Sequence, residues 1–330
     1  MVVPPELEIA LEAPTLADVF QARKVVYQHL KPTPLLRHSA LSQLTGAEIF
    51  VKCENLLPTG AFKVRGGLNL VSRLTDEEKK RGVITASTGN HGQSVAYAAR
   101  AYGVKAIIAA PQGNNPYKLK AMRNLGAEVV EVGKDFDEAR EWAGEEAARQ
   151  GYRFIHSGDE PYLIAGVATG SLELIEEVPD LDYILVPVGG GSGACGHCIA
   201  AKGVNPQVQV IGVQSEHAPA VYQTYKSHKF TTTPTIQTFA EGIATRVPFA
   251  LPYKIMQEKL DDMVLVTDDE LRQAIRIYLE TIHQVAEGAG AAPLAAALRY
   301  RERFAGKKVA LIISGGNLTL DTLKQILTEK

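Results

Sequence analysis

The sequence predicts an α/β protein whose mainly parallel sheets are flanked by helices. Short apolar runs alternate with longer helix-like stretches along most of the chain. Such runs are typical of strands that are buried on both faces of a parallel sheet. Glycine-rich segments follow several of these runs directly, and ligands of parallel sheets bind at the C-terminal ends of the strands. A length of 330 residues allows two domains of this kind.

The first half of the chain begins with one helix and then alternates strands and helices. Thr15 can cap a helix that runs to about residue 29, and the prolines at 32 and 34 end it. From residue 48 onward the apolar runs predict strands, and the stretches between them predict helices. We expect strands at 49–53, 83–86, 106–110 and 128–132, and helices after 63, at 92–102, after 116 and at 136–149.

The second half repeats the same alternation. The run 183–188 precedes a glycine loop and a helix, and the run 208–213 precedes another helix. Helices are expected at about 268–286 and 290–302, and the run 309–313 forms the last strand. This order again predicts a parallel sheet that is covered by helices.

Composition excludes several classes of partner. The formal net charge is −2 and the basic residues form no stripe or arm, so we expect no nucleic-acid partner. No apolar run is long enough to cross a membrane, and the N-terminal residues lack the basic region of a signal peptide. The three cysteines cannot all pair, which fits a reducing compartment. We therefore expect a cytoplasmic protein with no membrane partner.

Residues 58–67, PTGAFKVRGG, place Lys63 between a turn and a pair of glycines. A lysine at the start of a helix lies near the partial positive charge of the helix end, which lowers the pKa of its amine. A neutral amine is a nucleophile that can attack a carbonyl group. A single lysine is more often a solvated surface residue, so the functional interpretation of Lys63 depends on the other motifs.

Residues 189–193, GGGSG, form a loop between a strand and a helix. Glycine lets backbone N–H groups approach an anion, and the helix N-terminus adds its partial charge, so a phosphate is the expected ligand. Ala194 and Cys195 stand where a Walker A loop needs lysine and serine. The loop therefore predicts a phosphate site of another kind.

Two further segments end strands in polar residues. Residues 87–93, STGNHGQ, offer hydroxyls, an amide and the N–H groups of a helix start, a combination that binds carboxylates. In this segment, Asn90 can hydrogen-bond a phenolate oxygen. In the second segment, residues 314–317 (SGGN), Ser314 can hydrogen-bond a heterocyclic nitrogen. Either segment alone is also consistent with an ordinary helix cap or turn. Residues 241–244 and 287–291 are small-residue segments that a ligand can approach closely.

Together these motifs resemble the fold type II pyridoxal-phosphate (PLP) enzymes, specifically the threonine/serine dehydratase and serine racemase branch. The matching motifs, PTGAFKVRG, STGNHGQ, GGGSG, EGIA and SGGN, span roughly residues 31–317. The resemblance implies PLP as cofactor and a tryptophan synthase β-subunit-like fold of two domains. Residues 1–53 and 158–330 would form a large PLP-binding domain, and residues 54–157 a smaller mobile domain that carries the substrate-carboxylate loop.

The resemblance also implies a role for each motif residue. Lys63 would bind the cofactor covalently, and Phe62 would pack beside it. Asn90 would contact the 3-oxygen of the cofactor and Ser314 its pyridine nitrogen. The cofactor phosphate would be held by Gly189, Gly190, Gly191, Ser192 and Gly193. The substrate would contact Ser87, Thr88, Gly89, Asn90, His91 and Gly242.

The implied reaction is β-elimination from a β-hydroxy amino acid, L-threonine or L-serine, which yields a 2-oxo acid and ammonia. A serine hydroxyl does not enforce a protonated pyridine nitrogen as a carboxylate does, so the ring is a milder electron sink that suits elimination. Lys63 would remove the Cα proton, and the β-hydroxyl would leave with help from the cofactor phosphate.

Several alternatives stay open. Thr88 stands where racemases of the branch have a serine that serves the opposite face of Cα, so an amino-acid racemase is one. Ala61, Val167 and Gln214 depart from the pattern of the family, which motivates a dehydratase for a bulkier or acidic substrate such as phenylserine or 3-hydroxyaspartate. A β-replacement enzyme is disfavoured by the GAFKVRG motif. A non-catalytic PLP carrier is disfavoured by the intact lysine and carboxylate loop.

Three further expectations follow from the resemblance and from the cysteines. Gln214 and Ala220 occupy places where metal-binding relatives have carboxylates, so we expect no metal ligands and no divalent ion. Relatives form homodimers or homotetramers, so a homo-oligomer is expected. Cys195 and Cys198 have CxxC spacing. The expected phosphate site uses the same backbone segment, so we do not expect disulfide exchange.

Overall fold

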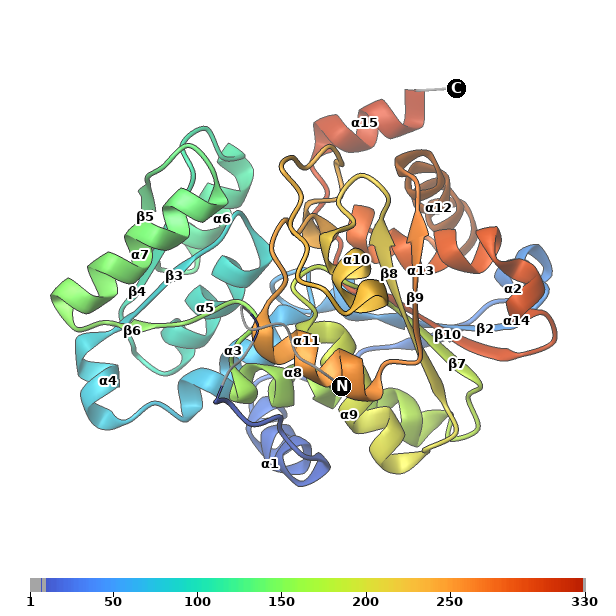
Figure 1. Ribbon diagram of the computed structural model, residues 1–330, viewed down its shortest axis with the longest axis horizontal. Coiled ribbons are helices and arrows are strands. Elements are labelled where there is room, and N and C mark those ends of the chain that lie inside the picture. Colours follow the sequence, from blue (N-terminus) through green and yellow to red (C-terminus); the bar gives the residue numbers. More distant parts are fainter. Residues whose placement is uncertain (1–6, 8–9, 329–330) are drawn as a thin grey trace.

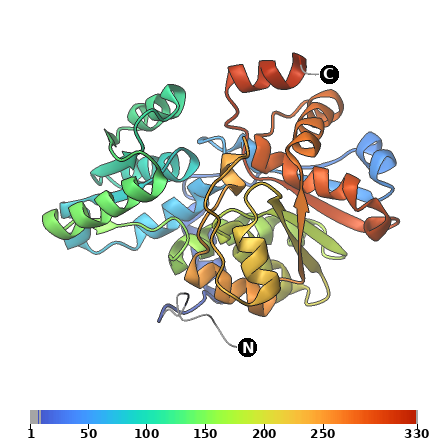
Figure 2. The same ribbon diagram turned by 45° about the horizontal axis from the view of Figure 1, so that its top comes forward.

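The structure is a computed structural model that describes residue 7 and residues 10–328. It contains a six-stranded and a four-stranded sheet, each flanked by helices. Figures 1 and 2 show the four-stranded sheet at one end of the molecule and the six-stranded sheet in the larger remainder. The expected α/β class is therefore confirmed. Most of the N-terminal segment that bears on a signal peptide lies outside the described residues.

The larger sheet has the strand order β1-β2-β10-β7-β8-β9. Every neighbouring pair is parallel except β1 with β2. The central strand β10 lies between β2 and β7, so three segments leave the sheet at one edge: the chain toward Lys63, Ser314, and the loop 189–193. The strands are β1 (Leu35–Arg37), β2 (Glu48–Cys53), β7 (Tyr183–Pro187), β8 (Gln209–Ser215), β9 (Asp262–Val266) and β10 (Lys308–Ile313).

The smaller sheet has the order β5-β4-β3-β6 and is parallel throughout. Its strands are β3 (Val83–Ala86), β4 (Ala106–Ala110), β5 (Glu128–Glu131) and β6 (Arg153–Phe154). The segment 87–93 follows β3, which is an inner strand. It therefore leaves the sheet at the C-terminal edge, where parallel sheets bind ligands.

Helices cover both sheets. Short 3-10 turns lie at η2 (Glu54–Leu56) and η3 (Glu241–Ile243). The α-helices are α1 (Leu16–Val26), α2 (Ser39–Thr45), α3 (Lys63–Ser72), α4 (Asp76–Arg81), α5 (Asn90–Ala101), α6 (Pro116–Asn124), α7 (Phe136–Gln150), α8 (Pro161–Glu177), α9 (Ser192–Val204), α10 (Ala220–Ser227), α11 (Ala250–Lys259), α12 (Asp268–Ile282), α13 (Gly288–Arg299), α14 (Arg301–Phe304) and α15 (Leu320–Thr328). Within the described residues, no helix is long and apolar enough to cross a membrane.

Every predicted strand is present, and Thr15 caps α1 as expected, since its hydroxyl accepts a hydrogen bond from the Asp18 N–H. The apolar pattern predicts neither helix α8 nor the strands β1, β6 and β9. Helix α8 packs against α1, α3 and α9 and is buried along most of its length. A helix that is buried on nearly all sides is apolar all round, so it lacks the 3.6-residue periodicity that reveals surface helices.

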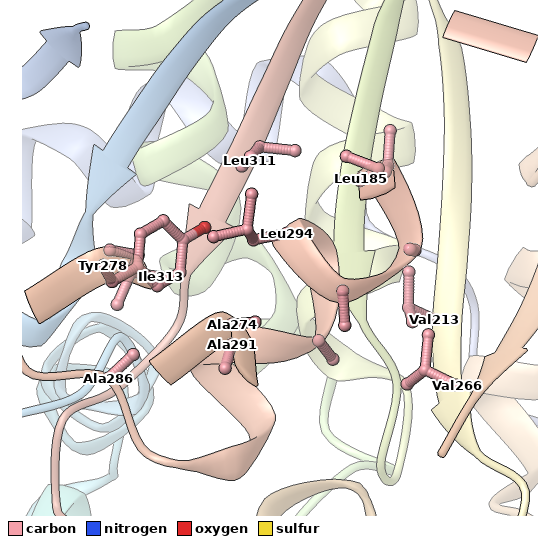
Figure 3. Close-up of a cluster of buried hydrophobic side chains, with 14 of the residues drawn as sticks. Leu185, Val213, Val266, Ala274, Tyr278, Ala286, Ala291, Leu294, Leu311 and Ile313 are labelled. Carbon is pink, nitrogen blue, oxygen red and sulfur yellow. The ribbon is translucent and has the colours of Figure 1, made fainter. Parts of the chain in front are cut away.

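The main core lies between the larger sheet and helices α12 and α13. Figure 3 shows Leu294 of α13 on the side of the sheet that carries Leu185 and Leu311. Tyr278 of α12 and Ile313 of β10 belong to the same buried cluster. Because α13 is rich in alanine, its backbone approaches the sheet closely, and this holds the strand ends of β7 and β10 in place.

A fully buried cluster of charges lies beneath the start of α3. Arg65 forms ion pairs with Glu54 at 2.7 Å and with Glu173 at 2.7 Å, and Lys52 pairs with Glu173 at 2.6 Å. All four side chains are at most 4% exposed. Burial alone would raise the pKa of Glu54, but Arg65 and Lys52 together hold it below its usual value. The cluster joins β2, η2, α3 and α8, and Arg65 lies two residues after Lys63.

Removal of Arg65 should therefore destabilise the fold strongly. We expect Arg65→Met to lower the free energy of unfolding by about 3–5 kcal/mol, because two buried carboxylates lose their main partner. Urea unfolding, followed by fluorescence in one fixed cofactor state, measures this change.

Arg23→Met is the matched control. Arg23 pairs with Glu176, and these side chains are 30% and 46% exposed, so the loss should be at most about 1 kcal/mol. Equal losses in the two variants would show that the buried cluster does not stabilise the fold in the manner described.

Candidate active site

One pocket of about 420 Å³ lies where the C-terminal ends of the two sheets face each other. It brings together segments from the two sheets that are more than 200 positions apart in the sequence. All of the site residues expected from the sequence line it: Phe62, Lys63, Ser87, Thr88, Gly89, Asn90, His91, Gly189, Gly190, Gly191, Ser192, Gly193, Gly242 and Ser314.

Lys63 is the first residue of α3. Its Nζ donates hydrogen bonds to Ser192 Oγ at 2.9 Å and to the Ser157 carbonyl at 3.2 Å. The same atom lies 5.4 Å from the centroid of the Phe62 ring. Burial lowers the pKa of Lys63 to about 8. This is the expected direction, and the cause is the loss of solvation on burial.

The loop 189–193 needs its glycines for steric reasons. A Cβ on Gly189 would lie 2.3 Å from the Gly242 carbonyl oxygen, and a Cβ on Gly190 would lie 2.3 Å from the Phe249 ring. Gly191 has φ +92°, in the left-handed region that favours glycine. Because α9 begins at Ser192, its first N–H groups have no partner within the helix and can bind an anion.

The carboxylate loop is held from within by Ser87. Its Oγ accepts hydrogen bonds from the N–H groups of Gly89 at 3.0 Å and Gly92 at 2.8 Å. Asn114 donates to the Thr88 carbonyl oxygen at 3.1 Å. Thr88 lines the pocket, and its hydroxyl has no hydrogen-bond partner among the described residues. Ser87 thus shapes the loop, while Thr88 keeps a free hydroxyl.

His91 is buried behind the same loop. Its Nε2 lies 3.0 Å from Thr85 Oγ1, and its Nδ1 has no partner. Burial, together with the nearby Lys63 and His156, lowers the pKa of His91 to about 3. The ring is therefore neutral at physiological pH and does not act as a fixed positive charge for a carboxylate.

Two residues without a predicted role orient Asn90. Its Nδ2 donates to Glu287 Oε1 at 2.7 Å, and its Oδ1 accepts from Asn317 Nδ2 at 2.7 Å. Asn317 also donates to the Thr59 carbonyl oxygen at 2.8 Å. These contacts settle which end of the amide is the donor, so one N–H of Asn90 remains for a ligand. Burial raises the pKa of Glu287. The only sequence signal for Glu287 is an acid placed directly before a small-residue run.

Three ion pairs join the two sides of the pocket. Lys118 of α6 pairs with Glu241 of η3 at 2.6 Å. Arg246 lies 3.6 Å from Asp135 and 3.5 Å from Asp137, at the start of α7. All five residues line the pocket, so these contacts lie at its walls.

The departures from the family pattern lie away from the pocket. Ala61, Val167 and Gln214 are buried, and none of them is among its lining residues. Gln214 Oε1 accepts a hydrogen bond from the Tyr222 N–H at 2.8 Å. These residues therefore do not enlarge the space for a substrate side chain.

Among the described residues, neither the cysteines nor the metal-ligating residue types form a second functional site. Cys195 and Cys198 are free and buried, and burial raises the pKa of Cys195 and brings that of Cys198 to about 12. A protonated thiol is a poor nucleophile. In the part of the chain that the structure describes, no three His, Cys, Asp or Glu side chains gather as a metal site needs.

Comparison with known proteins gives a consistent result. Residues 26–315 match the family described as pyridoxal-phosphate dependent enzyme. The chain is 41% identical over 315 residues to an L-threonine ammonia-lyase of Thermotoga maritima, covering 96% of this chain and 78% of that protein. It is 38% identical over 318 residues to a serine racemase of Dictyostelium discoideum, covering 95% and 98%. The solved structure of maize serine racemase superposes with a TM-score of 0.91 at 30% identity, covering 96% and 97%.

The pocket fits pyridoxal phosphate on its own geometry. The glycine loop packs too closely against its neighbours to carry side chains, and it leads into the N-terminus of α9, whose first N–H groups can bind a phosphate. Lys63 supplies an amine with a lowered pKa, and Asn90 keeps one amide N–H for a phenolate oxygen. The Ser314 hydroxyl has no hydrogen-bond partner among the described residues, so it is free to meet a ring nitrogen.

The pKa of Lys63 predicts how fast the cofactor aldehyde attaches to the apoenzyme. A lysine with a pKa of about 8 has about 300 times more neutral amine at pH 7 than one at the usual 10.5. The attachment rate, followed by visible absorbance, should rise with pH and level off above about pH 8. A rate that keeps rising tenfold per pH unit beyond pH 9 would contradict this assignment.

The crowding at Gly189 predicts a binding defect. Gly189→Ala should weaken PLP binding by about ten- to a hundredfold, because the added methyl displaces the loop from the Gly242 carbonyl. Gly144→Ala on α7 is the control, since nothing lies within 4 Å of its added Cβ. That control should bind PLP normally and gain up to about 1 kcal/mol of stability. Normal PLP binding by Gly189→Ala would refute the steric argument.

Proposed function

Because this chain belongs to the family of pyridoxal-phosphate-dependent enzymes, we propose that it removes water and then ammonia from L-threonine or L-serine, leaving a 2-oxo acid. The observation that carries this proposal is the pairing of Lys63, with its lowered pKa, and a serine hydroxyl at the end of β10 in one pocket. The Thermotoga maritima relative named L-threonine ammonia-lyase supports the same reaction.

When bound, pyridoxal phosphate withdraws electrons from the substrate Cα and so makes its C–H bond acidic. Lys63 is the proposed base, and Ser192 Oγ and the Ser157 carbonyl hold its Nζ in place. The N–H groups at the start of α5 bind the substrate carboxylate. The proton that leaves Cα and the hydroxide that leaves the β-carbon together make one water molecule. Hydrolysis of the remaining carbon–nitrogen unit then yields the 2-oxo acid and ammonia.

We further propose that residues 54–157 move as a unit against residues 1–53 and 158–330. The ion pairs Lys118–Glu241 and Arg246–Asp135 bridge these two parts at the pocket walls. Closure around the substrate excludes water while the reaction proceeds.

Racemisation is the second candidate. Thr88 lines the pocket and its hydroxyl has no partner among the described residues, and a hydroxyl can return a proton to Cα. The Dictyostelium discoideum relative named serine racemase supports this candidate. A β-elimination enzyme needs only the base, whereas a racemase needs a second proton donor.

The cellular setting is also proposed. We infer a cytoplasmic homodimer or homotetramer, since the cysteines are all free and the family resemblance implies an oligomer. Sedimentation of the PLP-loaded protein would reveal the assembly, and a monomer at micromolar concentration would contradict it.

Release of 2-oxo acid tests the main proposal. The PLP-loaded enzyme is supplied in turn with L- and D-serine, L- and D-threonine, threo-phenylserine and 3-hydroxyaspartate. We expect rapid release from L-threonine or L-serine, and a loss of at least about a thousandfold in Lys63→Ala. Release from phenylserine or hydroxyaspartate alone would refute the substrate assignment, and full turnover by Lys63→Ala would refute the role of the lysine.

Thr88 variants separate the two candidate activities. If Thr88 donates a proton, Thr88→Ala should slow conversion of L-serine to D-serine by about a hundredfold or more, with a much smaller loss of 2-oxo acid release. Thr88→Ser should retain both reactions because it keeps the hydroxyl. Chiral chromatography measures racemisation and a coupled assay measures the 2-oxo acid. Equal losses in both reactions would assign Thr88 to substrate binding instead.

A further inference from the structure

Helix α9 carries a histidine that the proposed mechanism does not use. His197 is 7% exposed, and its Nδ1 is buried without a hydrogen-bond partner. No hydrogen bond joins its ring to any residue that the structure describes. Burial lowers the pKa of His197 to about 4, so the ring is neutral and has one N–H donor. A buried donor without a partner is costly, and this calls for an explanation.

His197 lies one helical turn after Gly193, on the same face of α9. A Cβ on Gly193 would lie 3.3 Å from the Phe62 ring, so this face of the helix looks toward the back of the pocket. The charged cluster is also near, because Glu54, Lys52 and Arg65 all influence the pKa of His197.

A second, small cavity of about 10 Å³ lies against this face. Its polar lining residues are Glu54, His197 and Ser314, and apolar side chains complete its walls. Phe62 and Ser314 also line the main pocket. The small cavity therefore adjoins the main pocket at Phe62 and Ser314.

The size and chemistry of this cavity suit one water molecule. A buried water needs about 10–15 Å³ of accessible space and two to four polar partners. Glu54 is an acceptor, since Arg65 keeps it ionised at 2.7 Å. The Ser314 hydroxyl has no partner among the described residues, and His197 offers its single N–H.

We propose that the cavity holds one buried water that accepts a hydrogen bond from His197 and donates to Ser314 Oγ and to the Glu54 carboxylate. His197 is then a positioning residue for Ser314. This inference rests on the proposed contact between Ser314 and the pyridine nitrogen of the cofactor.

The water gives His197, Ser314 and Glu54 each a hydrogen-bond partner. Ser314 has one proton, and the ring nitrogen needs that proton as a hydrogen-bond donor. A water that donates to Ser314 Oγ leaves the hydroxyl proton directed at the cofactor, and a chain of bonds in one direction strengthens each member. Without His197 the water loses its donor, and the orientation of the Ser314 hydroxyl is no longer set.

A double-mutant cycle on the dissociation constant of PLP tests the inference without any assay of turnover. His197→Leu removes the polar ring at similar volume and should weaken PLP binding by about two- to tenfold. Ser314→Ala should also weaken it. In the Ser314→Ala background, His197→Leu should have an effect below about twofold, because His197 acts only through Ser314. His197→Gln, which keeps an N–H donor, should recover most of the affinity.

The control is Cys198→Ala, the next buried residue on α9, which does not line the small cavity. It should leave PLP affinity unchanged within about twofold even if it lowers stability. Additive losses for His197→Leu and Ser314→Ala would overturn the role of His197 and leave the proposed function standing. Unchanged affinity in Ser314→Ala would instead refute the proposed contact of Ser314, and the inference with it.

A high-resolution crystal structure of the PLP-loaded wild-type enzyme shows directly whether the water is present. This test does not depend on the folding of any variant. We expect one ordered water within hydrogen-bond distance of His197, Glu54 and Ser314. An empty cavity would overturn the proposal.

Discussion

The buried ion pairs of Arg65 are the interaction on which the site depends. Arg65 binds Glu54 and Glu173 at 2.7 Å in an environment without solvent, and such a cluster tolerates only one geometry because every charge needs its partner. Since Arg65 lies two residues after Lys63, the cluster determines where α3 begins relative to β2 and α8. The position of the Lys63 amine follows from that placement, and so does the bond between its Nζ and Ser192.

The parallel sheets provide the second constraint. Strands that run in one direction end at one edge, so loops that are distant in the sequence meet there. The central position of β10 places Ser314 between the segment after β2 and the loop after β7. The loop 189–193 can then approach Gly242, with no room for a single added carbon at Gly189. This close backbone contact fixes the loop at the edge of the pocket, next to the N-terminus of α9.

A layer of hydrogen-bonded residues in and behind the pocket wall sets the orientation of its polar groups. Asn317 and Glu287 determine which end of the Asn90 amide donates, and Ser87 binds the backbone of its own loop. His197 belongs to this layer in the proposal for Ser314. These residues come from segments that no sequence motif connects. Each occupies one hydrogen-bonding group of its partner and leaves another group available to a ligand.

The sequence by itself determined most of the strands, the α/β class and the residues that meet in the pocket, because local patterns and short motifs carry that information. Thr15 caps α1 and Lys63 begins α3 as expected, and the glycine-rich loop 189–193 follows β7. Only the tertiary structure decided the rest. Helix α8 lacks a periodic pattern because other elements surround it, and the pKa of Lys63 falls through burial. Glu287 and His197 acquire their surroundings from elements far away in the chain, and burial by distant residues leaves no mark in the local sequence.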